Sequence, residues 1–345
     1  MSGLTNPISS IAELEEKLAT SSPALVEDMS RLEGDILVLG AGGKMGPSLV
    51  KLACNAVAGA GVRKRVTAVS RFSQGGVREE LEAAGATTIA SDLLEPGALE
   101  TLPDSENVIY MAATKFGTAG REHFTWAQNA FLPGLVGKRY RDSRIVAFST
   151  GNVYPLVPVR TGGSRETDPV APIGEYAQSC LGRERLFEHA SHNYGTPIVL
   201  FRLNYAVELR YGALVDIALA IRSGQPIDIS MGHLNVIWQG DANEMALRSL
   251  SLCNSPPAVL NVTGPEVVTV TRVARQLGER LGTEPILVGE EQDTALLSDA
   301  GKAFGLFGYP TVPLEQLIDW VAHWVESDGS THGKPTHFGE RSGKF

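Results

Sequence analysis

The chain has 345 residues, and its 43% hydrophobic and 20% charged composition is ordinary for a globular protein with a sizeable core. Its formal net charge of −9 argues against a nucleic-acid partner, because no overall positive field attracts phosphate groups. The three cysteines are widely separated and the seven histidines form no paired ligand motif, which predicts neither a disulfide framework nor a metal site.

Residues 1–33 precede the first predicted strand and have the pattern of a helical extension. Ile11, Leu14 and Leu18 share one helical face, which predicts packing on the main domain; a homodimer contact is the alternative. The N-terminus carries no basic cluster followed by an apolar core, and no segment reaches the ~18 apolar residues of a membrane helix. We therefore expect a cytoplasmic protein without a membrane partner.

A glycine-rich turn follows the first predicted strand, 36–39. Gly40, Gly43 and Gly46 have the spacing G-x-x-G-x-x-G, and an apolar-periodic helix begins around Met45. Glycine allows a tight turn, a close approach of backbone N–H groups to a pyrophosphate, and tight packing of the helix on the strand. The free N–H groups and the dipole of the helix then favour the anion. This strand–turn–helix context predicts a dinucleotide-binding site.

The second predicted strand, 66–69, ends in Ser70 and Arg71. An acidic residue at this place accepts hydrogen bonds from the adenosine ribose in NAD-binding sheets, whereas an arginine can pair with a 2′-phosphate. We therefore expect NADP rather than NAD, with a solvated surface arginine as the alternative. After the third predicted strand, 87–90, Asp92 either accepts from the adenine amino group or caps the next helix.

Small and polar residues follow the next two predicted strands. The strand 108–111 is followed by Ala112 and Ala113, whose size lets the backbone lie close to a bound cofactor. The strand 145–148 leads to Thr150, and hydroxyl groups at the carboxyl end of a parallel strand lie in the crevice where ligands bind. A helix over 122–135 is expected between these two strands.

A long helix begins near Glu175, with Tyr176 in its first turn, and a sixth strand, 198–201, follows. Strands and helices alternate up to this point, which predicts an α/β fold with a doubly wound parallel sheet of the Rossmann type. Beyond Leu203 shorter, mixed elements predict a smaller C-terminal substrate lobe. We expect the Rossmann domain over 34–205, with 235–262 returning to it, the substrate-binding lobe over 206–234 and 263–330, and a surface tail over 331–345.

Assembled in order, these motifs resemble the extended short-chain dehydrogenase/reductase family, in its NAD-dependent epimerase/dehydratase branch. The resemblance spans about Asp35 to Val325. It rests on the glycine turn, Ser149-Thr150-x-x-Val153-Tyr154, Tyr176, Arg202-Leu203-Asn204, Gly224-x-Pro226 and Asn261-x-x-Gly264. It implies an NAD- or NADP-dependent enzyme that acts on sugar nucleotides, sugars, sugar acids or related hydroxy and keto compounds.

The resemblance also implies roles for single residues. Thr150 matches the hydroxyl residue that bonds the substrate oxygen, Tyr176 the acid/base that passes a proton during hydride transfer, and Asn129 the helix asparagine that supports the site. The motifs and the resemblance together predict cofactor contacts from Gly40, Gly43, Lys44, Met45, Gly46, Ser70, Arg71, Asp92, Leu93, Ala112, Ala113 and Tyr176.

Cys180 departs from the family pattern, which has a lysine four residues after the tyrosine. That lysine holds the nicotinamide ribose and lowers the pKa of the tyrosine, and a phenol with its ordinary pKa of ~10 is a poor base near neutrality. Three explanations are open. Another cation, Lys115 or Arg183, takes its place; Cys180 acts as a thiolate or redox group, or only fills space; or the protein binds its cofactor without turnover.

The substrate side is less defined by the sequence. An anionic group could be reached by Arg160, Arg165, Arg210 or Arg272, with surface solvation as the alternative for each. We expect an NADP(H)-preferring oxidoreductase or epimerase that acts on a small, sugar-like hydroxy or keto compound. The alternatives are a catalytically silent NADP(H)-binding sensor or scaffold, and RNA binding, against which the net acidity argues.

Overall fold

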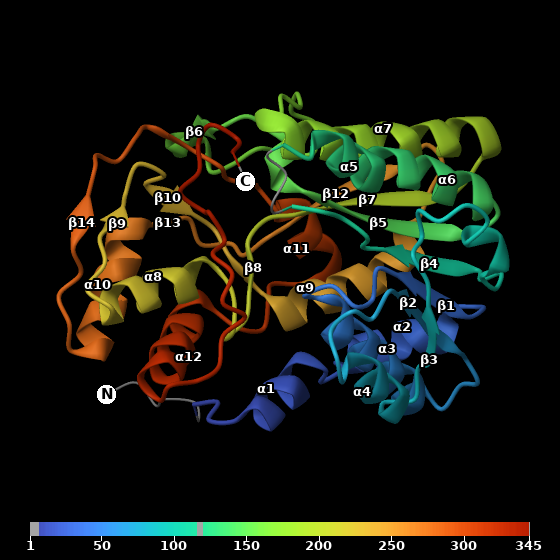
Figure 1. Cartoon of the computed structure of the whole chain (residues 1–345), viewed down its shortest axis with the longest axis horizontal. Coiled ribbons are helices and arrows are strands. Elements are labelled where there is room, and N and C mark those ends of the chain that lie inside the picture. Colours follow the sequence, from blue (N-terminus) through green and yellow to red (C-terminus); the bar gives the residue numbers. More distant parts are fainter. Residues whose placement is uncertain (1–6, 116–119, 345) are drawn as a thin grey trace.

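The computed structural model describes residues 7–115 and 120–344, and a seven-stranded parallel sheet forms its centre (Figure 1). The order across the sheet is β12-β7-β5-β4-β1-β2-β3, so the chain winds outward from β1 on one side and then on the other. This arrangement confirms the predicted doubly wound α/β fold, in which ligands bind outside the carboxyl ends of the strands where the order reverses. The strands are β1 (Ile36–Leu39), β2 (Val66–Ser70), β3 (Thr87–Ala90), β4 (Asn107–Tyr110), β5 (Arg144–Thr150), β7 (Ile198–Leu203) and β12 (Ala258–Val262).

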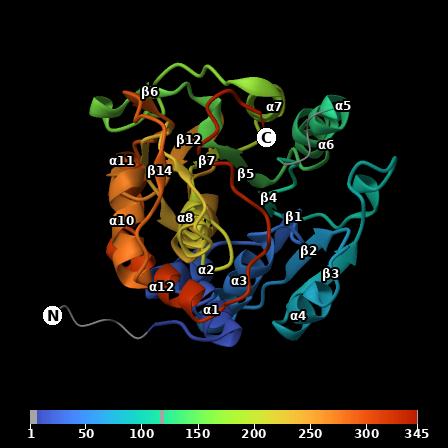
Figure 2. The same ribbon diagram turned by 60° about the vertical axis from the view of Figure 1, so that its left-hand side comes forward.

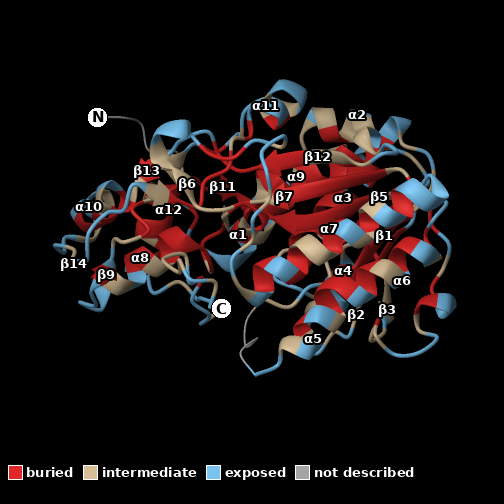
Figure 3. Cartoon of the chain, turned by 90° about the horizontal axis from the view of Figure 1, so that it is seen from above, coloured by how far each residue is buried: buried red, intermediate tan, exposed pale blue. Residues whose placement is uncertain are grey.

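Both faces of the sheet are covered. In β1, Ile36 and Val38 belong to one hydrophobic layer and Leu37 and Leu39 to the other, and all four are fully buried. Figure 3 shows the sheet as a buried band between its helices. Burial on both faces explains why the inner strands are mostly apolar in the sequence, whereas the edge strand β3 is only partly buried. One layer contains α2 (Pro23–Arg31), α3 (Gly46–Ala60), α9 (Gln239–Arg248) and α11 (Gly301–Phe307), and the other α6 (Leu132–Arg139) and α7 (Gly174–Tyr194).

A smaller lobe has its own hydrophobic cluster. Three amphipathic helices, α8 (Ala213–Arg222), α10 (Val270–Leu281) and α12 (Leu314–Glu326), meet in it. The rings of Trp238 and Trp320 pack edge to face there, with 5.4 Å between centroids. The N-terminal helix α1 (Ile11–Leu18) also packs on this cluster through Leu14 and Leu18. Short strand pairs complete the lobe: β6 (Val157–Pro158) with β15 (Thr294–Ala295), β8 (Ala206–Val207) with β11 (Ile237–Trp238), β9 (Ile227–Asp228) with β14 (Leu287–Val288), and β10 (His233–Leu234) with β13 (Val268–Thr269).

The remaining helical elements are short. The single helix expected over 122–135 is wrong in one respect, because a π-helical turn, Ala127–Phe131, separates α5 (Glu122–Trp126) from α6. Such turns often mark functional positions, and this one carries Asn129. The helix α11 was not predicted, since seven residues are too few to establish a helical period. The others are α4 (Val77–Ala83) and the 3₁₀ turns Leu99–Thr101, Gly151–Val153, Val159–Thr161 and Ser249–Leu252.

The C-terminal segment runs back from α12 across the molecule towards the start of α7 (Figure 2). The guanidinium of Arg341 donates to the carbonyl of Thr294 at 2.7 Å, and Gly343 packs so closely on Gly174 that a Cβ at either would overlap backbone. Thr336 is only 3% exposed. Residues 331–344, which we call the C-terminal strap, therefore contact both the lobe and the start of α7, while many of them, including 333–335 and 337, stay exposed. The sequence predicted a surface tail over this segment.

Within the described ranges, no helix is long and apolar enough to cross a membrane. The same residues contain no group of three or more histidine, cysteine, aspartate or glutamate side chains that could hold a metal ion. Cys54, Cys180 and Cys253 are all free thiols. Burial raises the pKa of Cys54 to about 11 and that of Cys253 to about 12, so both are neutral packing groups at physiological pH.

Candidate functional site

The turn between β1 and α3 brings the backbone very close to its neighbours. Gly40 has a φ of +92°, and a Cβ here would lie 2.6 Å from the backbone nitrogen of Ala112. A Cβ at Gly46 would overlap the carbonyl of Ala41. No side chain caps the first turn of α3, so no side chain competes for the N–H groups left there beside Pro47 and the Gly46 N–H, which donates to the carbonyl of Gly43. Only glycine fits this turn, and its shape is that of a pyrophosphate cradle.

A groove opens at the carboxyl ends of β1 to β4, beside the glycine turn. Most of the predicted cofactor residues lie in it, whereas Lys44, Met45 and Tyr176 line a second cavity and Gly46 is buried beneath the turn. The glycine turn itself forms one wall of the groove. The groove is lined by Gly40, Gly42, Gly43, Ser70, Arg71, Ser73, Ser91, Asp92, Leu93, Met111, Ala112, Ala113, Thr114 and Gln128.

Arg71 and Asp92 face each other in this groove, with 3.8 Å between Nη1 and Oδ2. The Arg71 side chain is largely exposed and that of Asp92 partly so, and at 3.8 Å the ion pair is weak. Oδ1 of Asp92 also accepts from the N–H of Leu94 at 3.1 Å. This contact caps a turn, and a capping role was the alternative to an adenine contact in the sequence analysis. With the hydroxyls of Ser70 and Ser73, Arg71 offers a set of donors suited to a phosphate group.

A second cavity lies at the carboxyl ends of β4, β5 and β7, between the sheet and the lobe. Thr150, the last residue of β5, and Tyr176, in the first turn of α7, meet here through a side-chain hydrogen bond. Each is only 8% exposed. Two hydroxyls held together in this way suit the binding of one substrate oxygen. The cavity is lined by Lys44, Met45, Lys115, Ser149, Thr150, Asn152, Tyr176, Leu203, Asn204, Tyr205, Ala206, Tyr211, Gly212, Ala213 and Thr336.

The surroundings of Tyr176 act on its pKa in opposite directions. Burial, with a contribution from Cys180, raises the pKa well above the ordinary value, while the charge of Arg183 and the hydrogen bond to Thr150 lower it. Arg183 is held in place, because its guanidinium donates to the carbonyl of Phe148 at 2.7 Å. Burial also raises the pKa of Cys180. At neutral pH Tyr176 is therefore a neutral phenol and Cys180 a neutral thiol, and Arg183 beside them carries a fixed positive charge.

Asn129 joins the end of β4 to α7. Its Oδ1 accepts from the N–H of Thr114 at 2.9 Å and from Arg183 at 3.1 Å, and its Nδ2 donates to Ser179 Oγ at 2.9 Å. Ser179 Oγ donates in turn to the carbonyl of Tyr176 at 2.7 Å. Asn129 thus orients both the turn that carries Tyr176 and the guanidinium of Arg183.

Two lysines line the same cavity as Tyr176. Lys115 Nζ lies 3.4 Å from the carbonyl oxygen of Thr336 and 5.8 Å from the centroid of the Tyr176 ring. Lys44 is exposed to the open cleft, yet its Nζ lies over the ring of Tyr211, 3.1 Å from the centroid. Desolvation of the ammonium groups lowers the pKa of Lys44 to about 7 and that of Lys115 to about 8, and the charge of Lys115 adds to the lowering at Lys44.

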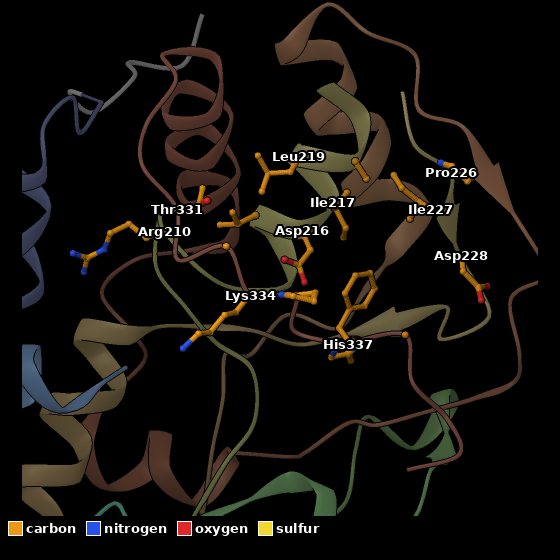
Figure 4. Close-up of a pocket in the computed structure, with 16 residues that line it drawn as sticks. Arg210, Asp216, Ile217, Leu219, Pro226, Ile227, Asp228, Thr331, Lys334 and His337 are labelled. Atoms are coloured by element: carbon orange, nitrogen blue, oxygen red, sulfur yellow. The ribbon is translucent and has the colours of Figure 1, made fainter. Parts of the chain in front are cut away.

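A third, apolar pocket lies between α8 and the C-terminal strap (Figure 4). Thr336 lines the cavity of Tyr176, whereas its neighbours Pro335 and His337 line this pocket, so the strap separates the two spaces. The strap is fixed here by Asp216, which accepts from the N–H and the hydroxyl of Thr336 at 2.7 and 2.6 Å. Burial raises the pKa of Asp216.

The four arginines proposed for the substrate side do not line the cavity of Tyr176. Arg210 lines the apolar pocket and is paired with Glu15 and Glu208, Arg165 pairs with Asp299, and Arg160 and Arg272 are exposed. Site-lining residues that were not among the predicted site residues include Ser73, Ser91, Thr114, Gln128, Asn152, Tyr205, Tyr211 and Thr336. Ser73 lies two residues after Arg71, so its closeness in sequence to a predicted cofactor residue could have indicated it. No sequence pattern around Thr336 indicates a role in the site.

Residues 36–207 match the family model described as "NAD dependent epimerase/dehydratase family". No curated protein matches the chain. A mutant UDP-glucuronic acid 4-epimerase from Bacillus cereus, with UDP-4-deoxy-4-fluoro-glucuronic acid and NAD, is similar with 19% identity and a TM-score of 0.72, over 85% of this chain and 99% of its own.

Two further solved structures show the same likeness. A UDP-glucose 4-epimerase from Thermotoga maritima, with UDP-glucose, has 19% identity and a TM-score of 0.69, over 85% of this chain and 99% of its own. A UDP-N-acetylglucosamine 4-epimerase from Methanobrevibacter ruminantium, with UDP-N-acetylmuramic acid, has 18% identity and a TM-score of 0.70, over 86% and 99%. Through residues 36–207, which carry the glycine turn, Thr150 and Tyr176, the chain belongs to the NAD dependent epimerase/dehydratase family.

Proposed function

We propose that this chain is an NAD(P)-dependent oxidoreductase or epimerase that acts on a sugar or sugar-derived hydroxy or keto compound, with Tyr176 as its acid/base. The observation that carries the proposal is the hydrogen-bonded pair of Thr150 and Tyr176, in a cavity beside the groove that begins at the glycine turn. The solved structures of similar fold include UDP-sugar epimerases, which supports a sugar-like substrate.

The groove fits a dinucleotide cofactor. A Cβ at Gly40 or Gly46 would fill the space against neighbouring backbone, and the uncapped first turn of α3 would hold the pyrophosphate. When bound, such a cofactor supplies a hydride donor or acceptor at its nicotinamide. Arg71, with Ser70 and Ser73 beside it, would hold a 2′-phosphate, so we propose NADP(H) as the preferred form. NAD, which is present in several of the similar structures, is the alternative.

Tyr176 would hold the proton that the reaction moves. Because burial raises its pKa, the phenol is protonated near neutral pH and can donate to a substrate oxygen as a carbonyl is reduced. The opposite direction needs the phenolate, which the charge of Arg183 and the hydrogen bond to Thr150 stabilise. We propose that Arg183 performs part of the electrostatic work that the family assigns to the lysine replaced by Cys180.

A catalytically silent NADP(H)-binding sensor or scaffold is the second candidate. Cys180 favours it, because a buried neutral thiol supplies no charge to Tyr176 or to a nicotinamide ribose. This candidate keeps the glycine turn and the groove, so it predicts cofactor binding without turnover. The two candidates therefore differ in turnover and agree in binding.

The test is a turnover assay on a panel of sugars, sugar acids and UDP-sugars with NADP⁺ and NAD⁺. Oxidoreduction is followed by the absorbance of the reduced nicotinamide, and epimerisation, which leaves the cofactor unchanged overall, by NMR of the sugar. We expect Tyr176→Phe to lose about 10²-fold or more of the wild-type rate while binding the cofactor unchanged. Tyr194→Phe is the matched control, since Tyr194 is 43% exposed on the same helix. Full activity of Tyr176→Phe overturns the acid/base role, and cofactor binding without turnover on the whole panel supports the silent candidate.

A further inference from the structure

Lys44 and Lys115 reach the cavity of Tyr176 from two separate segments, and the proton transfer described above uses neither. Lys44 lies within the glycine turn after β1, and Lys115 follows the end of β4. Two ammonium groups close enough for their charges to interact repel each other, and desolvation in a cleft adds to the free-energy cost. An arrangement of this kind is stabilised when an anion binds between the two groups.

The carboxylates that act on Lys44 are Glu208 and Asp216, and both have other partners. Glu208 accepts from Arg210 Nε at 3.1 Å, and Asp216 accepts from Thr336. Lys44 makes no ion pair with any residue in the described part of the chain; its ammonium is held by the face of the Tyr211 ring. Its positive charge is therefore only partly compensated by the protein.

We propose that Lys44 and Lys115 together bind an oxyanion, a carboxylate or phosphate group, of the substrate whose reacting oxygen lies at Tyr176. The inference rests on the proposed function, because it concerns the same cavity. It narrows the substrate to an acidic hydroxy or keto compound, such as a sugar acid or sugar phosphate, and disfavours a neutral sugar. The pKa values of about 7 and 8 would rise on binding, since a bound anion favours the protonated lysines.

The phosphates of the cofactor are the other source of oxyanions near the glycine turn. Against them, Lys44 and Lys115 line the cavity of Tyr176 and are absent from the residues that line the groove with Arg71. The backbone N–H groups at the start of α3 already offer a place for the pyrophosphate. An experiment has to separate the two sources, because their chemistry is the same.

Three sugars separate the possibilities: glucose, glucuronic acid and glucose 6-phosphate share one ring and differ in the group on a single carbon. Their dissociation constants are measured by calorimetry on the full chain, with and without NADP⁺, at a mildly acidic pH at which both lysines are protonated. We expect at least one acidic probe to bind about tenfold or more tightly than glucose, the effect of a charged hydrogen-bond partner.

The variants assign this preference to the two lysines. Combining Lys44→Met with Lys115→Met should abolish the preference, combining Lys44→Arg with Lys115→Arg should keep most of it, and Lys138→Met, at an exposed lysine on α6, should change nothing. Circular dichroism and thermal unfolding check that each variant folds.

Acidic probes that bind no more tightly than glucose, including the case in which no probe binds, overturn the proposal. It also fails if the preference for an acidic probe persists in the double methionine variant. If that variant has in addition lost affinity for NADPH, the two lysines bind the cofactor. Failure here leaves the proposed function intact as long as turnover still depends on Tyr176. If the preference for acidic probes is intact but turnover does not depend on Tyr176, the acid/base role of Tyr176 fails and the binding role of the two lysines stands.

Discussion

The guanidinium of Arg183 acts on the Tyr176 hydroxyl from two turns further along α7 and lowers its pKa against the effect of burial. Arg183 is 3% exposed and donates to the carbonyl of Phe148 and to Asn129, so its position is fixed. Arginine also keeps its charge at any physiological pH. The family has its cation one turn after the tyrosine; this chain has a neutral cysteine there and a permanent cation one turn later.

Replacing Arg183 by glutamine removes this charge. We expect the pH profile for oxidation of a hydroxyl substrate to move to higher pH, because the pKa of Tyr176 rises further and less phenolate forms at a given pH. A rise of one pKa unit lowers kcat/KM at neutral pH about tenfold. The measurement is kcat/KM against pH for the wild type, Arg183→Gln and Arg183→Lys, where the lysine variant keeps a charge. A profile that does not move in Arg183→Gln contradicts the electrostatic role.

Replacing Cys180 by serine should leave turnover within about twofold of the wild type, since the buried thiol is neutral and serine preserves its size and hydrogen-bonding capacity. The less apolar hydroxyl should lower the free energy of unfolding by about 1–2 kcal/mol. Steady-state rates and denaturant unfolding measure the two effects separately. A loss of activity beyond tenfold with a normal unfolding transition would show that the thiol itself takes part.

Replacing Arg71 by aspartate should weaken NADPH binding about 10- to 100-fold, since a charged donor to the 2′-phosphate is lost and a like charge takes its place. NADH affinity should stay the same or improve, because an acidic residue at this place can accept from the ribose hydroxyls. Fluorescence titration with both cofactors measures the ratio. Arg78→Asp, at an exposed arginine on α4, is the control, and an unchanged ratio in Arg71→Asp refutes the NADP assignment.

Removing residues 331–345 should open the cavity of Tyr176 to the apolar pocket beside α8, since Thr336 stands between them. We expect the ratio of dissociation constants for glucuronic acid and UDP-glucuronic acid to move in favour of the larger ligand. Calorimetry on the wild type and the shortened chain gives this ratio, and Thr336→Ala, which removes the hydroxyl bond to Asp216, is the milder variant. An unchanged ratio means that the strap does not limit access.

The central sheet was predictable because its information is local. The inner strands are mostly apolar runs buried on both faces, and Gly40 ends the first of them with a positive φ that the sequence marks with a glycine. The start of α7 at Gly174 and its end before Gly195 were predictable for the same reason, and they place Tyr176 in the first turn.

The rest of the site depends on contacts between segments far apart in the sequence. Thr336 is buried only because Asp216 and Lys115 are brought to it by the lobe and by β4, and no local pattern encodes that meeting. Lys44 belongs to the glycine turn by sequence, yet its side chain lies with Tyr211. The burial that sets the pKa values of Tyr176 and Arg183 exists only once β5 and α7 have packed.

The most direct test of the account is a titration of the purified chain with NADPH and with NADH, followed by intrinsic fluorescence. The account predicts saturable binding of both, with NADPH the tighter ligand. A higher affinity for NADH contradicts only the part assigned to Arg71. Binding of neither cofactor would mean that the groove beside Gly40 holds no dinucleotide, and the proposed hydride-transfer function would be wrong.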